Sequence, residues 1–160
     1  MAEGLAGQTR VCDKVKPSQV LTQSIAERIL GQPTRLTPDT TTMRGNVRQC
    51  MCAYFGVSKD KETGQDSVIY FSLEEKETTP SPEEAHQVIV STREANVHDN
   101  EIPDLSGIGD EAFLLSNDPY SHLIMARKGG VIMRLQVKKA IGTNSLVESK
   151  AFAAKVFNQL

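Results

Sequence analysis

The segment from 131 to 139 alternates between two kinds of side chain, and this pattern constrains the fold more than any other. One face holds Val131, Met133, Leu135 and Val137, and the other holds Ile132, Arg134, Gln136 and Lys138. Successive side chains of a strand point to opposite faces of a sheet. We therefore expect one face on a core and one toward water, which is typical of an antiparallel sheet covered on one side.

Four further segments have strand-like patterns, and they are 48–57, 67–75, 111–116 and 122–128. The first two are joined by the polar stretch 58–66, which contains Gly64. Lys128-Gly129-Gly130 is a tight connection before the last strand. Short polar connections between neighbouring strands predict antiparallel pairing.

Three helices are predicted from their capping signals. Ser24 and Glu27 have the spacing of a capping box, with Thr22 as a rival cap, and Gly31 ends that helix. Ser81-Pro82-Glu83-Glu84 begins the second helix, which ends near Asn96. Ser145 and Glu148 begin the third. The expected fold class is α+β, with a mainly antiparallel sheet of about five strands in the order α-β-β-α-β-β-β-α.

A chain of 160 residues is close to the commonest domain size, so one domain is expected. We expect residues 1–20 to be an irregular N-terminal segment tethered by Cys12, and residues 21–160 to form a single α+β domain. Residues 32–47 contain Thr, Pro and Gly without strand or helix periodicity, so they are predicted to be a long loop.

Net charge and hydropathy exclude some function classes. The formal charge is −2 and the pI is near 5.9, whereas nucleic-acid-binding domains usually have a pI above about 9. No apolar stretch approaches the roughly 20 residues that span a bilayer. The first residues lack the basic and apolar regions of a signal peptide. The protein is then either cytoplasmic or the mature form of an exported precursor.

The three cysteines bear on that choice. A disulfide could join Cys12 to either Cys50 or Cys52, closing a loop of roughly 40 residues worth ~4 kcal/mol in the chain-entropy model. The alternative is three buried thiols in a reducing compartment. A Cys-x-Cys pair does not have zinc-ligand spacing. The histidines are scattered singly, at His86, His98 and His122. No metal site is predicted.

The sequence shows no cofactor motif in a suitable context. Gly107-Ile-Gly109-Asp110-Glu-Ala matches the dinucleotide fingerprint, but a strand-like segment follows it where the fingerprint needs a helix. We interpret Gly107, Gly109 and Asp110 as a structural turn in which Asp110 bonds local amides. No nucleophile–base constellation stands out, and Glu83 and His86 are interpreted as a solvated surface pair. No catalytic residue or cofactor is therefore predicted.

Several short sequence motifs occur in a fixed order along the chain. They are Cys12, the helix Leu21–Gly31, Cys52-Ala-Tyr54, Leu105-Ser-Gly-Ile-Gly-Asp-Glu-Ala112 and Arg127-Lys-Gly-Gly130 before an apolar strand. Over about residues 12–160 the chain resembles small exported bacterial lipoproteins and periplasmic proteins of unknown function, the LpqN-like and related families. The resemblance implies a PsbP-like α/β fold, an extracytoplasmic location, a removed signal sequence, a possible lipid anchor in the precursor and a Cys12–Cys52 disulfide.

The leading functional hypothesis is an extracytoplasmic binding or accessory module that contacts another protein or a cell-envelope component. Its candidate surfaces are the outward sheet face at Tyr70, Ile132 and Arg134, and the loop 32–47. A small ligand between sheet and helices is a second version of this hypothesis. The alternatives are a hydrolase-type enzyme with scattered polar residues and a cytoplasmic chaperone-like partner binder.

Overall fold

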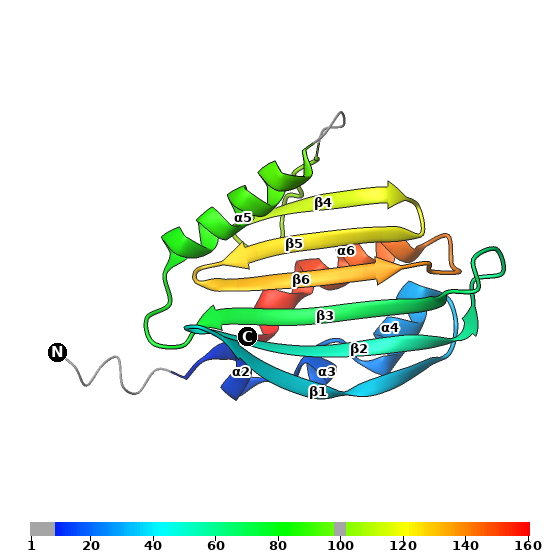
Figure 1. Ribbon diagram of the computed structural model, residues 1–160, viewed down its shortest axis with the longest axis horizontal. Coiled ribbons are helices and arrows are strands. Elements are labelled where there is room, and N and C mark those ends of the chain that lie inside the picture. Colours follow the sequence, from blue (N-terminus) through cyan, green and yellow to red (C-terminus); the bar gives the residue numbers. More distant parts are fainter. Residues whose placement is uncertain (1–8, 98–101) are drawn as a thin grey trace.

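A six-stranded antiparallel sheet forms the centre of the computed structural model, which describes residues 9–97 and 102–160. Its strands run in the order β1-β2-β3-β6-β5-β4 (Figure 1). Their bounds are β1 Thr34–Arg44, β2 Val47–Lys59, β3 Asp66–Lys76, β4 Glu111–Asp118, β5 Ser121–Lys128 and β6 Val131–Lys138. The expected α+β class and antiparallel sheet are confirmed.

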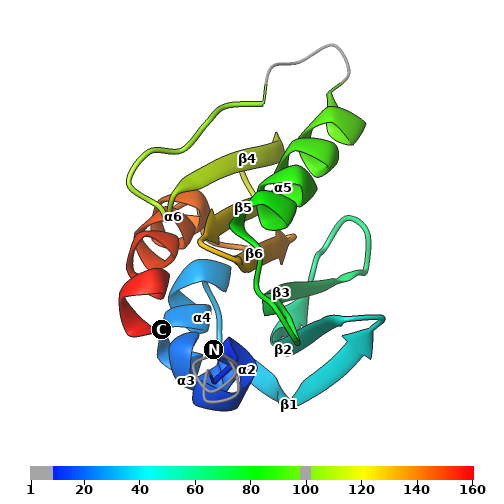
Figure 2. The same cartoon turned by 90° about the vertical axis from the view of Figure 1, so that its left-hand side faces the viewer.

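Helices cover the two faces of this sheet unequally (Figure 2). The helices are α2 Val11–Lys14, α3 Pro17–Val20, α4 Gln23–Leu30, α5 Pro82–Asn96 and α6 Ser145–Val156, with a 3-10 turn at Phe157–Gln159. Four of them, α2, α3, α4 and α6, pack on one face, which we call the inner face. Helix α5 alone packs on the other, the outer face, where it contacts β5 and β6.

The predictions were wrong for β1 and for the N-terminal segment. Thr34–Arg44 was expected to be loop, but it pairs with β2 along its length. Pro38 fits there because it lies in the bulge between Thr37 and Thr40 of an edge strand, where no ladder hydrogen bond is required of it. The sheet therefore has six strands. Residues 11–20, expected to be irregular, form the short helices α2 and α3.

The helix starts follow the capping signals in part. Ser81 caps α5 as predicted, since its side chain accepts a hydrogen bond from the Glu84 amide. Thr22, the rival cap, begins α4, and Gly31 ends that helix in the left-handed conformation. The predicted Ser145 capping box does not form, because Ser145 is the first residue of α6 and its side chain is buried.

The inner face carries the main core. Its sheet residues include Tyr54, Ile69, Phe71 and Leu135, all fully buried. The ring of Phe71 lies 5.2 Å, centroid to centroid, from that of Phe152 on α6. A smaller, separate apolar cluster lies between α5 and the outer face. The two sides of the sheet are thus stabilised by cores of different size.

The disulfide joins Cys12 to Cys50, with Cα atoms 5.7 Å apart, and Cys52 is a buried free thiol. This corrects the Cys12–Cys52 pairing that the family resemblance implies. Cys50 and Cys52 both point to the inner face, so the position of α2 decides the pairing. The Val11 amide donates to Glu75 at the end of β3, and this contact places Cys12 over the nearer cysteine, Cys50.

Candidate functional site

Only part of the predicted binding surface is exposed in the structure. Tyr70 and Arg134 lie on the outer face and are partly exposed. Ile132 is on the same face but is 4% exposed, because α5 packs on it together with Phe113 and Met125. This corrects the expectation that Ile132 contributes to a binding surface. Alternation placed it on the outer face correctly but could not show that a helix covers it.

The outer face of β1, β2 and β3 has no helix over most of its area among the described residues (Figure 2). Helix α5 approaches β3 with its N-terminal part, where Glu84 Oε2 lies 2.7 Å from Lys76 Nζ. We call this area, with the adjoining edge of β6, the open face. Its apolar side chains are Met51, Phe55 and Tyr70, which are partly exposed, and Ala53 and Val68, which are each only 5% exposed.

An aromatic pair lies on the open face. Phe55 and Tyr70 are partly exposed, and their rings meet edge to face with centroids 6.4 Å apart. Lys138 Nζ lies 5.8 Å from the Tyr70 ring centroid, a cation–π distance. Sequence analysis placed Tyr70 on this face but missed Phe55 and Lys138, although the alternation of both strands was available to place them.

Basic side chains surround that pair. Arg134 and Lys76 are neutralised by Glu74 and Glu84. Three further basic residues, Arg35, Arg44 and Lys138, are exposed and form no ion pair with any residue in 9–97 or 102–160. The open face is therefore locally positive although the whole chain carries −2.

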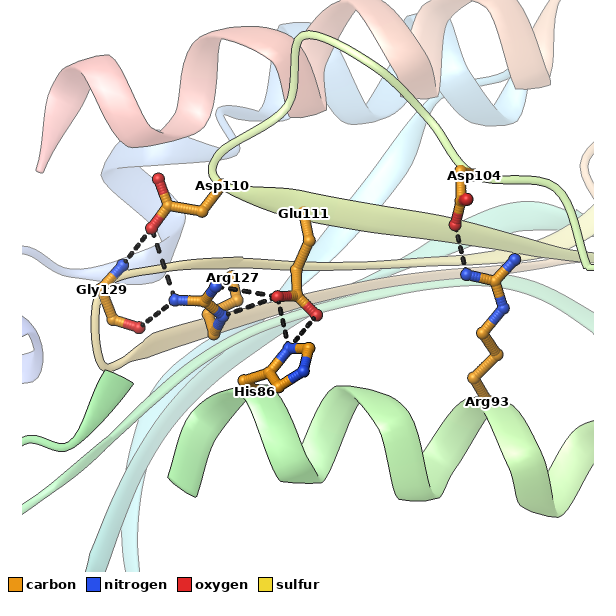
Figure 3. Close-up of polar contacts among 7 residues, drawn as sticks. All are labelled: His86, Arg93, Asp104, Asp110, Glu111, Arg127 and Gly129. Carbon is orange, nitrogen blue, oxygen red and sulfur yellow. Dashed lines mark hydrogen bonds and ion pairs between the residues drawn. The ribbon is translucent and has the colours of Figure 1, made fainter. Parts of the chain in front are cut away.

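A second polar group of residues lies where α5 crosses the start of β4 (Figure 3). His86 Nδ1 lies 2.7 Å from Glu111 Oε2, and the same carboxylate accepts a hydrogen bond of 2.8 Å from Arg127 Nη2. Asp110 accepts a bond of 2.8 Å from the Gly129 amide, and Arg127 also binds the Gly129 carbonyl. The surface pair predicted for His86 with Glu83 is replaced by this contact between α5 and β4.

This network holds α5 and the β5–β6 hairpin against β4. Burial alone would raise the pKa of Glu111, but the hydrogen bonds from Arg127 and His86 lower it overall, so the carboxylate is ionised.

Farther along α5, Arg93 binds Asp104 and the Ile102 carbonyl. Gly107 and Gly109 turn the chain into β4 with positive φ of 79° and 58°. Asp110 binds the distant amide of Gly129, whereas local amides were expected.

The residues around His86 can support only a limited range of catalytic chemistry. The depression beside His86 is open, with a volume of about 800 Å3. It is lined by Pro82, Glu83, Glu84, His86, Gln87, Glu111 and Arg127. None of these residues offers a hydroxyl, thiol or amine nucleophile. A histidine oriented by a carboxylate can transfer a proton, but nucleophilic catalysis needs a nucleophile within its reach.

Another serine–histidine contact lies in the core. His122 Nε2 is 2.7 Å from Ser149 Oγ on α6, and both residues are buried. Burial lowers the pKa of His122 to about 4, so the ring is neutral at physiological pH. His122 is 4% exposed and Ser149 is fully buried, so the pair presents almost no surface to a substrate. We interpret it as part of the packing between α6 and the sheet.

Metal ligands and membrane-spanning helices are two further features that bear on function. Within residues 9–97 and 102–160, no group of three or more His, Cys, Asp or Glu side chains is placed to hold a metal ion. His98 lies outside the described residues. No described helix combines the length and apolar character needed to cross a bilayer.

Comparisons with protein-family models, with curated proteins and with solved structures find no significant match to this chain. The resemblance to exported lipoproteins thus stays a prediction, and the open face and the His86 network rest on the geometry alone.

Proposed function

We propose that the protein is an extracytoplasmic binding or accessory module that contacts another protein through the open face. The observation that carries this proposal is the aromatic pair Phe55–Tyr70, with Lys138 beside it, on the half of the sheet that no described helix covers. Aromatic residues and arginine are enriched in protein-binding interfaces and hot spots, and Arg35 and Arg134 lie on the same face as this pair. A sheet whose inner face already has a full core has no structural need for such a group on its outer face.

The extracytoplasmic location is supported by the Cys12–Cys50 disulfide. Disulfides persist in oxidising compartments and are rare in the cytosol. The resemblance to exported lipoproteins agrees with this location and adds a lipid anchor in the precursor. Fractionation of native cells, with and without detergent phase separation, tests both points. A reduced protein in the cytosolic fraction would instead favour the chaperone-like binder.

Photo-crosslinking in native cells tests the binding function. A photoreactive phenylalanine analogue replaces Tyr70 in one variant and Val147 in a matched control. Val147 is 67% exposed on α6, on the opposite side of the sheet. We expect a discrete adduct from position 70 and none from position 147. Equal adducts from both positions, or none from either, would contradict the proposal.

The competing hydrolase function is favoured by one observation, the His86–Glu111 pair in its open depression. A panel of ester, phosphoester and peptide substrates, assayed with the protein and with His86→Gln, tests it. We expect no turnover above that of the variant, because no hydroxyl, thiol or amine nucleophile lines the depression. Turnover that His86→Gln abolishes would favour the enzyme.

A further inference from the structure

The charges of the open face indicate the chemistry of its partner. Arg35, Phe55, Val68 and Lys138 lie in one row across four strands, in direct register. Neighbouring strands are about 4.8 Å apart, so the Cα atoms of the two basic residues are separated by roughly 14 Å. Between them the row is apolar. A surface of this kind has two positive ends and an apolar middle.

A single small anion would bridge the two ends of this row only if both long side chains folded inward. Arg134 stands four residues from Lys138 along β6, roughly 13 Å away at about 3.3 Å per residue. The basic groups are thus spread over the face and do not converge on one point, as ligands of a lone phosphate would. Negative charges spaced along an extended chain fit this spread.

We propose that the open face binds an acidic polypeptide segment of the partner that also carries apolar side chains. This inference rests on the proposed function. The unpaired cations Arg35, Arg44 and Lys138 attract its carboxylates, and Met51, Phe55 and Tyr70 contact its apolar groups. The apolar row between the cations favours a polypeptide over a nucleic acid, whose backbone presents phosphates throughout. The net charge of the chain, −2, also disfavours a nucleic acid.

Fluorescence anisotropy with a defined probe tests the inference. The probe is a labelled 12-residue peptide in which Glu and Asp alternate with Phe and Leu, and its counterpart replaces every acid with Lys. We expect the acidic peptide to bind and the basic one not to bind. Affinity should fall as salt rises from 50 to 300 mM, because screening weakens charge pairs at an exposed surface.

A charge-matched pair of variants locates the binding. Arg35→Glu with Lys138→Glu should weaken binding of the acidic peptide at least tenfold. Lys150→Glu with Lys155→Glu, two exposed positions on α6 across the sheet, changes the net charge equally and should leave the affinity within twofold. Circular dichroism and the unfolding midpoint of each variant confirm that it is folded.

Several outcomes would overturn the inference. They are no binding of the acidic peptide, equal binding of both peptides, equal loss in both charge variants, or tighter binding of single-stranded oligodeoxythymidine at the same face. A dimer of the protein itself that the Arg35→Glu and Lys138→Glu changes dissociate would also overturn it. If position 70 crosslinks in cells while the acidic peptide fails to bind, the proposed function stands and only the partner chemistry is wrong.

Discussion

At the scale of single residues, burial decides the chemistry of the ionisable side chains. Cys52 and His122 both lie on the inner face, within the main core or against it. Burial disfavours the charged form of each, so it raises the pKa of the thiol and lowers that of the imidazole. We therefore expect neither group to be reactive in the folded protein, although in sequence each is a plausible functional residue.

Cys52 should be inert to thiol reagents in the native state. Burial, with a smaller contribution from the Asp39 charge, raises its pKa to about 12, and the thiolate is the reactive form. We expect less than one tenth of the protein to be alkylated by iodoacetamide in an hour at pH 8. In denaturant without reductant, intact mass should show one modified thiol. Rapid stoichiometric alkylation of the native protein would contradict this prediction.

His122 should make stability depend on pH. Its pKa is about 4 in the folded state and 6.5 as a reference, so the unfolded chain binds the proton more strongly between these values. Stability is complete above pH 6.5 and falls as pH decreases through this window, by about 2 kcal/mol between pH 7 and pH 5.

Urea unfolding at pH 7 and pH 5 measures this loss. The variant His122→Gln keeps a hydrogen-bonding side chain beside Ser149 but does not titrate, so it should lose about 2 kcal/mol less than the parent protein over the same interval. An identical pH dependence in both proteins would show that other groups cause it.

At the scale of elements, two segments in the first third of the chain depend on long-range partners. Strand β1 is stabilised by its ladder with β2, and α2 is held by the disulfide and by the contact of Val11 with Glu75. A helix of four residues is not stable by itself in water. Both segments therefore form only because the rest of the fold presents a partner to them.

Removal of the disulfide should destabilise the fold. The bond joins two cysteines that are 38 residues apart in sequence. The chain-entropy model gives a stabilisation of about 4 kcal/mol for closing such a loop. Cys12→Ser should lower the free energy of unfolding in urea by up to that amount and expose residues 10–16 to limited proteolysis. Reduction of the parent protein should have the same effect as Cys12→Ser. An unchanged unfolding midpoint in Cys12→Ser would contradict the prediction.

At the scale of the whole molecule, the helices on the two sides of the sheet differ in how much apolar surface they bury against it. Helix α4 buries three of its eight residues completely, whereas α5 buries two of fifteen and is held by polar contacts at Glu84, His86 and Arg93. Helices with few buried apolar contacts open locally more readily. The outer layer should therefore be the less stable one.

Hydrogen exchange tests this difference between the layers. His86→Ala removes one of the three polar contacts, so amides of α5 should exchange at least threefold faster while those of α4 and α6 are unchanged. Gln87→Ala, at an exposed neighbouring position on the same helix, is the matched control and should have no effect. Acceleration throughout the protein would show that His86 supports the whole fold.

Local patterns predicted much of the fold. Alternation located five strands, and the cap at Ser81 and the stop at Gly31 bounded two helices. Strand β1 was missed because its Thr-rich, Pro-containing sequence has no apolar face of its own, and its stability comes from backbone pairing with β2. Of the candidate site, Tyr70 and Arg134 could be assigned to the outer face from the alternation of side chains along their strands alone.

By itself, the sequence determined which residues lie on each face of the strands, because side-chain direction in a strand depends only on position along the chain. It also determined where helices could begin and end, since caps act within one turn. Only the tertiary structure decided that Cys12 meets Cys50, that α5 covers Ile132, and that Phe55, Tyr70 and Lys138 form one partly exposed group. These contacts join segments far apart in sequence, and packing sets their positions.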